Sequence, residues 1–119
     1  MNEVRDSEPD ADTTRKQLIE LFLRRSVTEL EQMRRGVPSL IKGDDAAWRE
    51  VRFNAQRIAG TASALQLGVL NACAKELAAL TEERFSRVTL DAHFLLTVTS
   101  AIEMVAIELA RLLSEPAGP

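Results

Sequence analysis

The stretch VRFNAQRIAGTASALQLG, residues 51–68, carries two stripes of side chains at helical spacing. Together with the preceding Trp48, its apolar residues recur every three or four positions, which aligns them on one face of an α-helix. These residues are Trp48, Val51, Ala55, Ile58, Ala62 and Leu65. We therefore expect a helix that buries this face in the core of the protein.

The opposite face of the same helix is less polar than a solvated helix surface usually is. Its residues are Arg49, Phe53, Gln56, Gly60, Ser63 and Leu67. A glycine inside a helix costs about 1 kcal/mol relative to alanine, so Gly60 beside an exposed phenylalanine indicates close approach of another surface. In the alternative interpretation, Phe53 bends into the edge of a helical bundle, Leu67 lies at the helix end and Gly60 is merely tolerated.

Residues 56–66, QRIAGTASALQ, resemble the signature helix of histidine phosphotransfer (HPt) domains, whose pattern is His-x-Leu-Lys-Gly-Ser-x-x-x-Leu-Gly. The positions that match are Ile58, Gly60, Thr61 and Leu65. Three positions depart from the pattern: Gln56 stands at the phosphoaccepting histidine, Ala59 at the lysine and Gln66 at the second glycine. The resemblance covers about Leu18 to Leu113 and implies an all-α, antiparallel up-down four-helix bundle.

The resemblance implies a recognition surface without the family's phosphotransfer chemistry. An imidazole accepts a phosphoryl group through a ring nitrogen with a free lone pair, whereas the amide nitrogen of Gln56 is delocalised and is not a nucleophile. Ala59 provides no cation; the nearby arginines either partly replace the lysine or simply solubilise the surface. We expect no catalytic residue and a partner-binding surface. Its residues are Arg49, Arg52, Phe53, Gln56, Arg57, Gly60, Ser63, Ala64 and Leu67.

Three hypotheses about function follow. The first is a signalling protein of a two-component phosphorelay that binds the receiver domain of a response regulator or hybrid histidine kinase without accepting phosphate. The second is a working phosphotransfer protein in which Gln56 is an introduced replacement for the active histidine. The third is a structural or oligomerising helical bundle with no role in a phosphorelay.

Composition excludes several other classes of protein. Residues 1–12 hold five acidic residues against Arg5, a sum of −4, so the rest of the chain carries about +1 of the net −3. This balance does not favour nucleic-acid binding. A single cysteine, Cys73, and a single histidine, His93, build neither a disulfide nor a zinc site, so we expect a reducing cytoplasmic setting and no cofactor or metal. We judge Cys73 to be a small apolar-face residue and His93 a surface residue.

The length of 119 residues predicts a single domain over residues 13–114, between an acidic tail (1–12) and a frayed end (115–119). No stretch looks long and apolar enough to span a bilayer, so we expect no membrane partner, and we expect a monomer. The first helix should begin near Thr13 or Thr14 and break at the segment Gly36-Val37-Pro38. Later helices are expected over residues 46–67, 69–85 and 90–113.

Most core positions outside residues 51–68 are predicted from the same periodicity. In the first helix they are Leu18, Leu21, Phe22, Arg25 or Ser26, Glu29 or Leu30, and Met33. In the third they are Leu70, Cys73 or Ala74, Leu77 and Leu80, and in the fourth Phe94 or Leu95, Val98, Ile102, Val105, Leu109 and Leu112.

Overall fold

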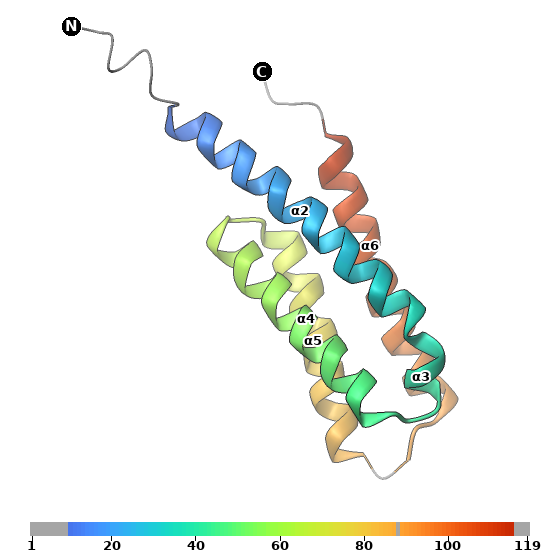
Figure 1. The fold of residues 1–119 in the computed structure, drawn as a ribbon. Coiled ribbons are helices and arrows are strands. Elements are labelled where there is room, and N and C mark those ends of the chain that lie inside the picture. Colours follow the sequence, from blue (N-terminus) through green and yellow to red (C-terminus); the bar gives the residue numbers. More distant parts are fainter. Residues whose placement is uncertain (1–9, 88, 116–119) are drawn as a thin grey trace, which may run out of the picture.

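All regular secondary structure in the described part of the chain is helical, as predicted. The structure is a computed structural model that describes residues 10–87 and 89–115. Its helices are α2 (Ala11–Arg35), α3 (Val37–Ile41), α4 (Asp45–Ala64), α5 (Gly68–Ser86) and α6 (Ala92–Ser114). They pack side by side as a helical bundle (Figure 1).

Three of the four long helices, α2, α4 and α6, begin after an aspartate whose side chain caps the helix. Asp10 accepts a hydrogen bond from the backbone N–H of Thr13 at 2.7 Å, Asp44 from Ala46 at 2.9 Å and Asp91 from Phe94 at 2.7 Å. The first helix therefore begins at Ala11, and the prediction of a start near Thr13 or Thr14 was wrong because Asp10 is the cap. Residues 10–12 thus belong to the helical body; residues 1–9 and 116–119 lie outside the described residues.

The predicted break at Gly36-Val37-Pro38 is confirmed. Gly36 ends α2, and Pro38 lies in the first turn of the short helix α3, where its missing N–H removes no intrahelical bond. Gly43 follows with φ 81°, a conformation that glycine adopts without strain. The chain thus turns sharply between α3 and α4.

The turn between α4 and α5 comes earlier than predicted. Helix α4 ends at Ala64, and the residue with positive φ is Gln66, at 61°. Gly68, which we expected in the turn, is instead the first residue of α5. Leu67 therefore leaves the helical register of α4 and packs partly buried against the core.

The helices surround the core in the order α4, α5, α6, α2. Helix α4 packs most extensively along α5, α5 along α6 and α6 along α2, whereas α2 and α4 meet more sparsely. Helices α4 and α6 therefore lie diagonally across the core. Between them the Trp48 and Phe94 rings are stacked with their centroids 6.0 Å apart, and Trp48 Nε1 donates a hydrogen bond to the carbonyl oxygen of Leu40.

Most predicted core positions are buried, whereas Phe22, Leu80 and Leu112 are half-buried. The five predicted α4 residues from Trp48 to Ala62 are buried, and so are Ala74 and Phe94, whereas Leu65 and Cys73 are half-buried. The placement of Leu18 and Leu21 in the core was wrong, since their exposed fractions are 53% and 69%. They lie where α2 and α4 meet only sparsely. The buried residues of α2 are Leu23, Ser26, Glu29, Leu30 and Met33.

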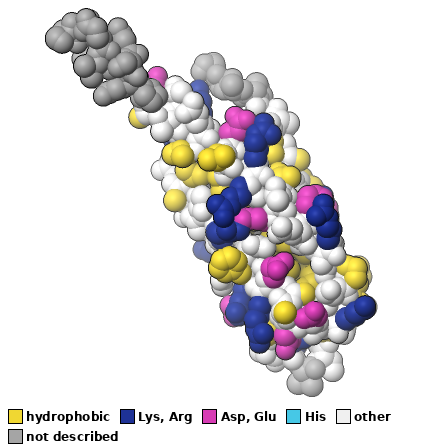
Figure 2. All heavy atoms as spheres, viewed as in Figure 1, with side chains coloured by type: hydrophobic (Ala, Val, Ile, Leu, Met, Phe, Trp, Pro, Cys, Tyr) yellow, Lys and Arg dark blue, Asp and Glu magenta, His cyan; other side chains and the backbone are white. Residues whose placement is uncertain are grey.

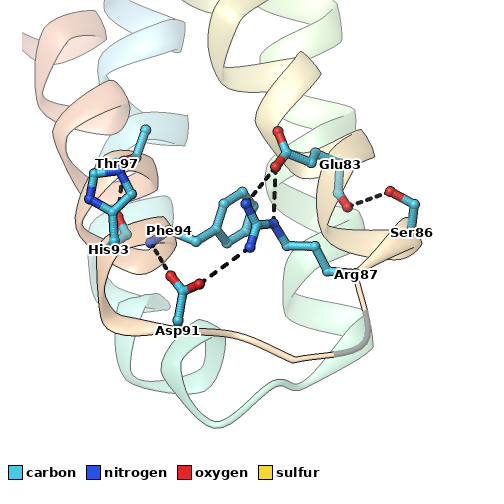
Figure 3. Close-up of polar contacts among 7 residues, drawn as sticks. All are labelled: Glu83, Ser86, Arg87, Asp91, His93, Phe94 and Thr97. Carbon is cyan, nitrogen blue, oxygen red and sulfur yellow. Dashed lines mark hydrogen bonds and ion pairs between the residues drawn. The ribbon is translucent and has the colours of Figure 1, made fainter.

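Arg87 organises the connection between α5 and α6 (Figure 3). Its guanidinium lies 2.7 Å from a carboxylate oxygen of Glu83 and 3.5 Å from one of Asp91. The same group stacks over the Phe94 ring at 4.0 Å from the centroid, a cation–π arrangement. Arg87 thereby links the last turn of α5 to the cap of α6.

The expectation that no stretch is long and apolar enough to span a bilayer does not hold for helix α6. Among the described residues it is the one helix whose length and composition would suffice to cross a bilayer. Part of that apolar character belongs to the bundle core, where Phe94, Val98, Ile102, Val105 and Leu109 are buried. The remainder lies outside, on the exposed side chains of Leu96, Met104 and Ile107.

Candidate binding surface on helix α4

The outward face of α4 presents most of the predicted partner-binding residues together. We call this set the α4 surface; its exposed members are Arg49, Phe53, Gln56, Gly60, Ser63 and Ala64. The exposed fraction of Phe53 is 62%, so its ring does not bend into the bundle edge. Arg52 and Arg57 are half-buried at its borders, and Leu67 does not belong to it because α4 ends three residues earlier.

Arg57 is held by three neighbours rather than directed into solvent. Its guanidinium forms an ion pair with Glu29 of α2, donates to the Asn54 Oδ1 at 3.3 Å and lies 5.5 Å from the Phe53 ring centroid. Glu29 is only 8% exposed and is also 3.5 Å from Arg25. Arg57 therefore links α4 to α2 through an ion pair and restricts the orientation of Phe53.

Arg52 and Arg49 lie at the border between α4 and α5. Arg52 contacts a carboxylate oxygen of Glu82 at 3.3 Å and stacks over the Phe85 ring at 5.1 Å from its centroid. Arg49 lies over the same ring, 5.7 Å from the centroid. Arg52 and Arg57 thus contact carboxylates on neighbouring helices, which argues against either acting as a free substitute for the lysine of the HPt pattern.

Gln56 lies exposed near the middle of the α4 surface, where its amide offers one donor group and one acceptor to a partner. Ala59, at the lysine position, is buried with 7% of its surface exposed. Position 59 in this bundle therefore points toward the neighbouring helices. Gln56 has no nucleophilic nitrogen to accept a phosphoryl group, and Ala59 has no charge to neutralise one.

Gly60 leaves open space above the middle of α4. A Cβ atom added at this position would meet no atom within 4 Å. No close approach within the described part of the chain therefore requires glycine here. The small side chains of Ser63 and Ala64 continue this low region toward the end of the helix.

An open groove beside the α4 surface was missed from the sequence. It lies between the middle of α2 and the C-terminal half of α4, has a volume of about 310 Å³ and is mostly apolar. Leu18, Leu21, Ile58 and Leu65 line its apolar part, and the Arg57–Glu29 pair lies within it. Figure 2 shows hydrophobic side chains gathered near this end of α2, with acidic and basic side chains mixed below them. The exposed leucines of α2 were the available signal, but helical periodicity assigned them to the core.

A second contact between α2 and α4 lies at the other end of this groove. Arg15 of α2 donates a hydrogen bond to the carbonyl oxygen of Leu65 at 2.5 Å. Leu65 is the C-cap residue of α4, at the end of the helix, where carbonyl acceptors lack intrahelical partners. The α2 helix is therefore tied to α4 at both ends of the groove, which stays open between them.

His93 lies on the surface, as predicted, whereas Cys73 is only half-buried. His93 is exposed in the first turn of α6 and points away from the Arg87 cluster (Figure 3). Cys73 is half-buried, and burial, followed by the charges of Glu108 and Glu76, raises the pKa of its thiol. A raised pKa disfavours the reactive thiolate. In the described residues no group of three or more His, Cys, Asp and Glu side chains is placed to hold a metal ion.

Comparison of the chain with known protein families, curated proteins and solved structures gave no match.

Proposed function

We propose that this protein binds the receiver domain of a response regulator or hybrid histidine kinase through the α4 surface and does not accept phosphate. It would then act as an adaptor or competitor in a two-component phosphorelay. The proposal combines the resemblance of residues 56–66 to the HPt signature with the exposure of that helix face. An exposed Gln56 flanked by Phe53 and Gly60 is the observation that carries it.

The chemistry of the α4 surface supports protein recognition. Phe53 supplies a large apolar contact whose orientation Arg57 restricts, so little side-chain entropy is lost on binding. Gly60, Ser63 and Ala64 admit a partner backbone or helix without a steric barrier. The neighbouring groove adds an apolar recess of about 310 Å³ for a partner side chain.

The finer arrangement of the bundle forms part of this proposal. We infer an antiparallel up-down four-helix bundle of the HPt kind, built from α2, α4, α5 and α6. The short helix α3 is then a local elaboration between the first two. The order of the helices around the core and the turn between α4 and α5 support this arrangement.

A titration against purified receiver domains of the source organism tests the proposal. Gly60→Arg fills the open space above α4 and Phe53→Ala removes its largest apolar contact. Each should weaken the tightest receiver complex at least about tenfold. Ile41→Ala, at an exposed apolar residue of α3, is the matched control and should leave the affinity unchanged. A tight receiver complex that neither α4 substitution weakened would place the interface elsewhere.

Phosphotransfer itself should be absent. After incubation with a receiver domain carrying an aspartyl phosphate, intact-mass spectrometry should show the chain without an added phosphoryl group, because position 56 has no nucleophile. His93 is the alternative acceptor to check, since it is exposed. A stable phosphoryl adduct on His93 would contradict the proposal.

A further inference from the structure

The groove between α2 and α4 is bounded at both of its ends. The Glu29–Arg57 ion pair joins the two helices at one end, and the hydrogen bond from Arg15 to the carbonyl oxygen of Leu65 joins them at the other. Its volume of about 310 Å³ lies at the lower end of the range for small-molecule sites, roughly 300–1,000 Å³. A bounded recess of this size suits a small ligand better than a helix or strand of a partner protein.

The walls of the groove are apolar, and the leucines on its α2 side are in contact with water. Leu18 and Leu21 are 53% and 69% exposed, while Ile58 of α4 forms a buried part of the lining. From Leu18 to Glu29 the lining follows about 16 Å of α2, at a helical rise of about 1.5 Å per residue. An alkyl chain lying along this length would remove the two leucines from water.

The charged side chains of the lining carry more positive than negative charge. They are Arg25, Glu29 and Arg57. Both guanidinium groups approach the same carboxylate oxygen, Oε2 of Glu29, and Arg25 does so from 3.5 Å. One carboxylate, itself only 8% exposed, thus serves two cations. The excess of one positive charge favours an anionic group over a neutral or cationic one beside the apolar wall.

Arg25 is the cation that a ligand can reach. Its side chain is 70% exposed, and its closest approach to Glu29 is made by Nε. Among the described residues no hydrogen bond accompanies that contact, so the Nη groups of Arg25 keep their donors for a carboxylate. Arg57 is held more firmly, since it is 35% exposed and also donates to Asn54. An anion paired with Arg25 would therefore leave the link between α2 and α4 intact.

We propose that this groove binds a free aliphatic carboxylic acid, with its chain against Leu18, Leu21 and Ile58 and its carboxylate paired with Arg25. The chain covers the exposed leucines, and the carboxylate supplies the second negative charge that the two arginines lack. The ligand is thus selected by an apolar wall and a cation in one recess. The proposal does not rest on receiver binding by the α4 surface.

A titration of the isotope-labelled full chain with decanoate tests the site. Amide chemical shifts are recorded below the concentration at which decanoate forms micelles. We expect saturable changes at Leu18, Leu21 and Ile58, with a dissociation constant below about 1 mM. The absence of saturation in that range would overturn the proposal. Changes centred on the exposed side chains of Leu96 and Ile107 of α6 would overturn it as well.

Two substitutions in the groove separate its apolar wall from its cation. Leu21→Gln and Arg25→Gln should each raise the dissociation constant of decanoate at least about fivefold. Both positions are exposed, so the helical circular dichroism of each variant should match the wild type. Arg24→Gln is the matched control, because Arg24 pairs with Glu20 and does not line the groove. Equal effects of Arg24→Gln and Arg25→Gln would contradict the assignment of the carboxylate to Arg25.

Changing the head group of the probe tests the charge preference. Decanol and decyltrimethylammonium have the same alkyl chain as the decyl series but a neutral or cationic head, and each should bind at least about fivefold more weakly than decanoate. Equal affinity for all three would show unselective apolar adsorption and overturn the proposal. So would a chain that binds vesicles of anionic phospholipid but not free decanoate. No receiver domain is present in these experiments, so their failure leaves the proposed function standing.

Discussion

Gln66 adopts a backbone conformation that favours glycine, while six residues earlier Gly60 occupies a helical position with room for a side chain. Gln66 has φ 61°, in the left-handed region, where a residue with a Cβ is strained by about 1 kcal/mol. It stands where the HPt pattern has its second glycine. The turn is therefore made by a residue with a Cβ in a conformation that favours glycine.

Replacing Gln66 by glycine should stabilise the protein. We expect Gln66→Gly to raise the free energy of unfolding by about 1 kcal/mol, because it removes the left-handed strain. The matched control is Ser63→Gly, three residues earlier inside α4, which should lower it by about 0.5 kcal/mol through lost helix propensity. Urea denaturation followed by circular dichroism measures both. A loss of stability in both variants would mean that the turn does not strain Gln66.

Gly60→Ala separates the stability of α4 from its use as a surface. The added Cβ meets no atom within 4 Å, and alanine is favoured over glycine inside a helix by about 1 kcal/mol. We expect the free energy of unfolding to rise by about that amount in the same denaturation assay. A destabilised variant would show that Gly60 is required by the fold, and would remove the reason for assigning it to a partner.

At the scale of the helices, Glu29 and Arg57 determine how α2 meets α4. Glu29 is almost buried and pairs with Arg57 and Arg25, so its removal leaves two guanidinium groups without their shared carboxylate. Arg57 remains about one-third exposed, and water therefore offsets part of the loss.

Glu29→Ala should lower the free energy of unfolding by about 1–2 kcal/mol. Glu20→Ala is the control within the same helix, because Glu20 pairs with Arg24 where both side chains are well exposed; its effect should stay within about 0.5 kcal/mol. Thermal or urea unfolding compares the two. Equal effects would indicate that the Glu29–Arg57 pair stabilises the protein no more than an ordinary surface ion pair.

Helix boundaries and faces were predictable wherever local chemistry decides them. The break at Gly36-Val37-Pro38 and the buried face from Trp48 to Ala62 follow from proline geometry and periodicity. Leu18 and Leu21 were misplaced because periodicity identifies an apolar face without showing how closely the neighbouring helix packs; α4 runs beside them but leaves an open groove. The end of α4 was misplaced because Gln66, not a glycine, makes the turn.

For the molecule as a whole, the diagonal placement of α4 and α6 separates two surfaces that differ in chemistry. The α4 surface combines Phe53 with a border of arginines and small residues, while the outward face of α6 exposes Leu96, Met104 and Ile107. The sequence indicated the first through its resemblance to the HPt signature. It did not indicate the second, since the sequence of an apolar helix does not distinguish buried apolar residues from exposed ones.

The most direct test of receiver binding maps the interface on the protein itself. Amide chemical shifts of the isotope-labelled chain are recorded while an unlabelled receiver domain is added. We expect the largest changes at Phe53, Gln56 and Gly60, extending into the groove at Leu18 and Leu21, with the amides of Leu96 and Ile107 unaffected. Changes centred on α6, or no change with any receiver domain of the source organism, would contradict the assignment of the α4 surface.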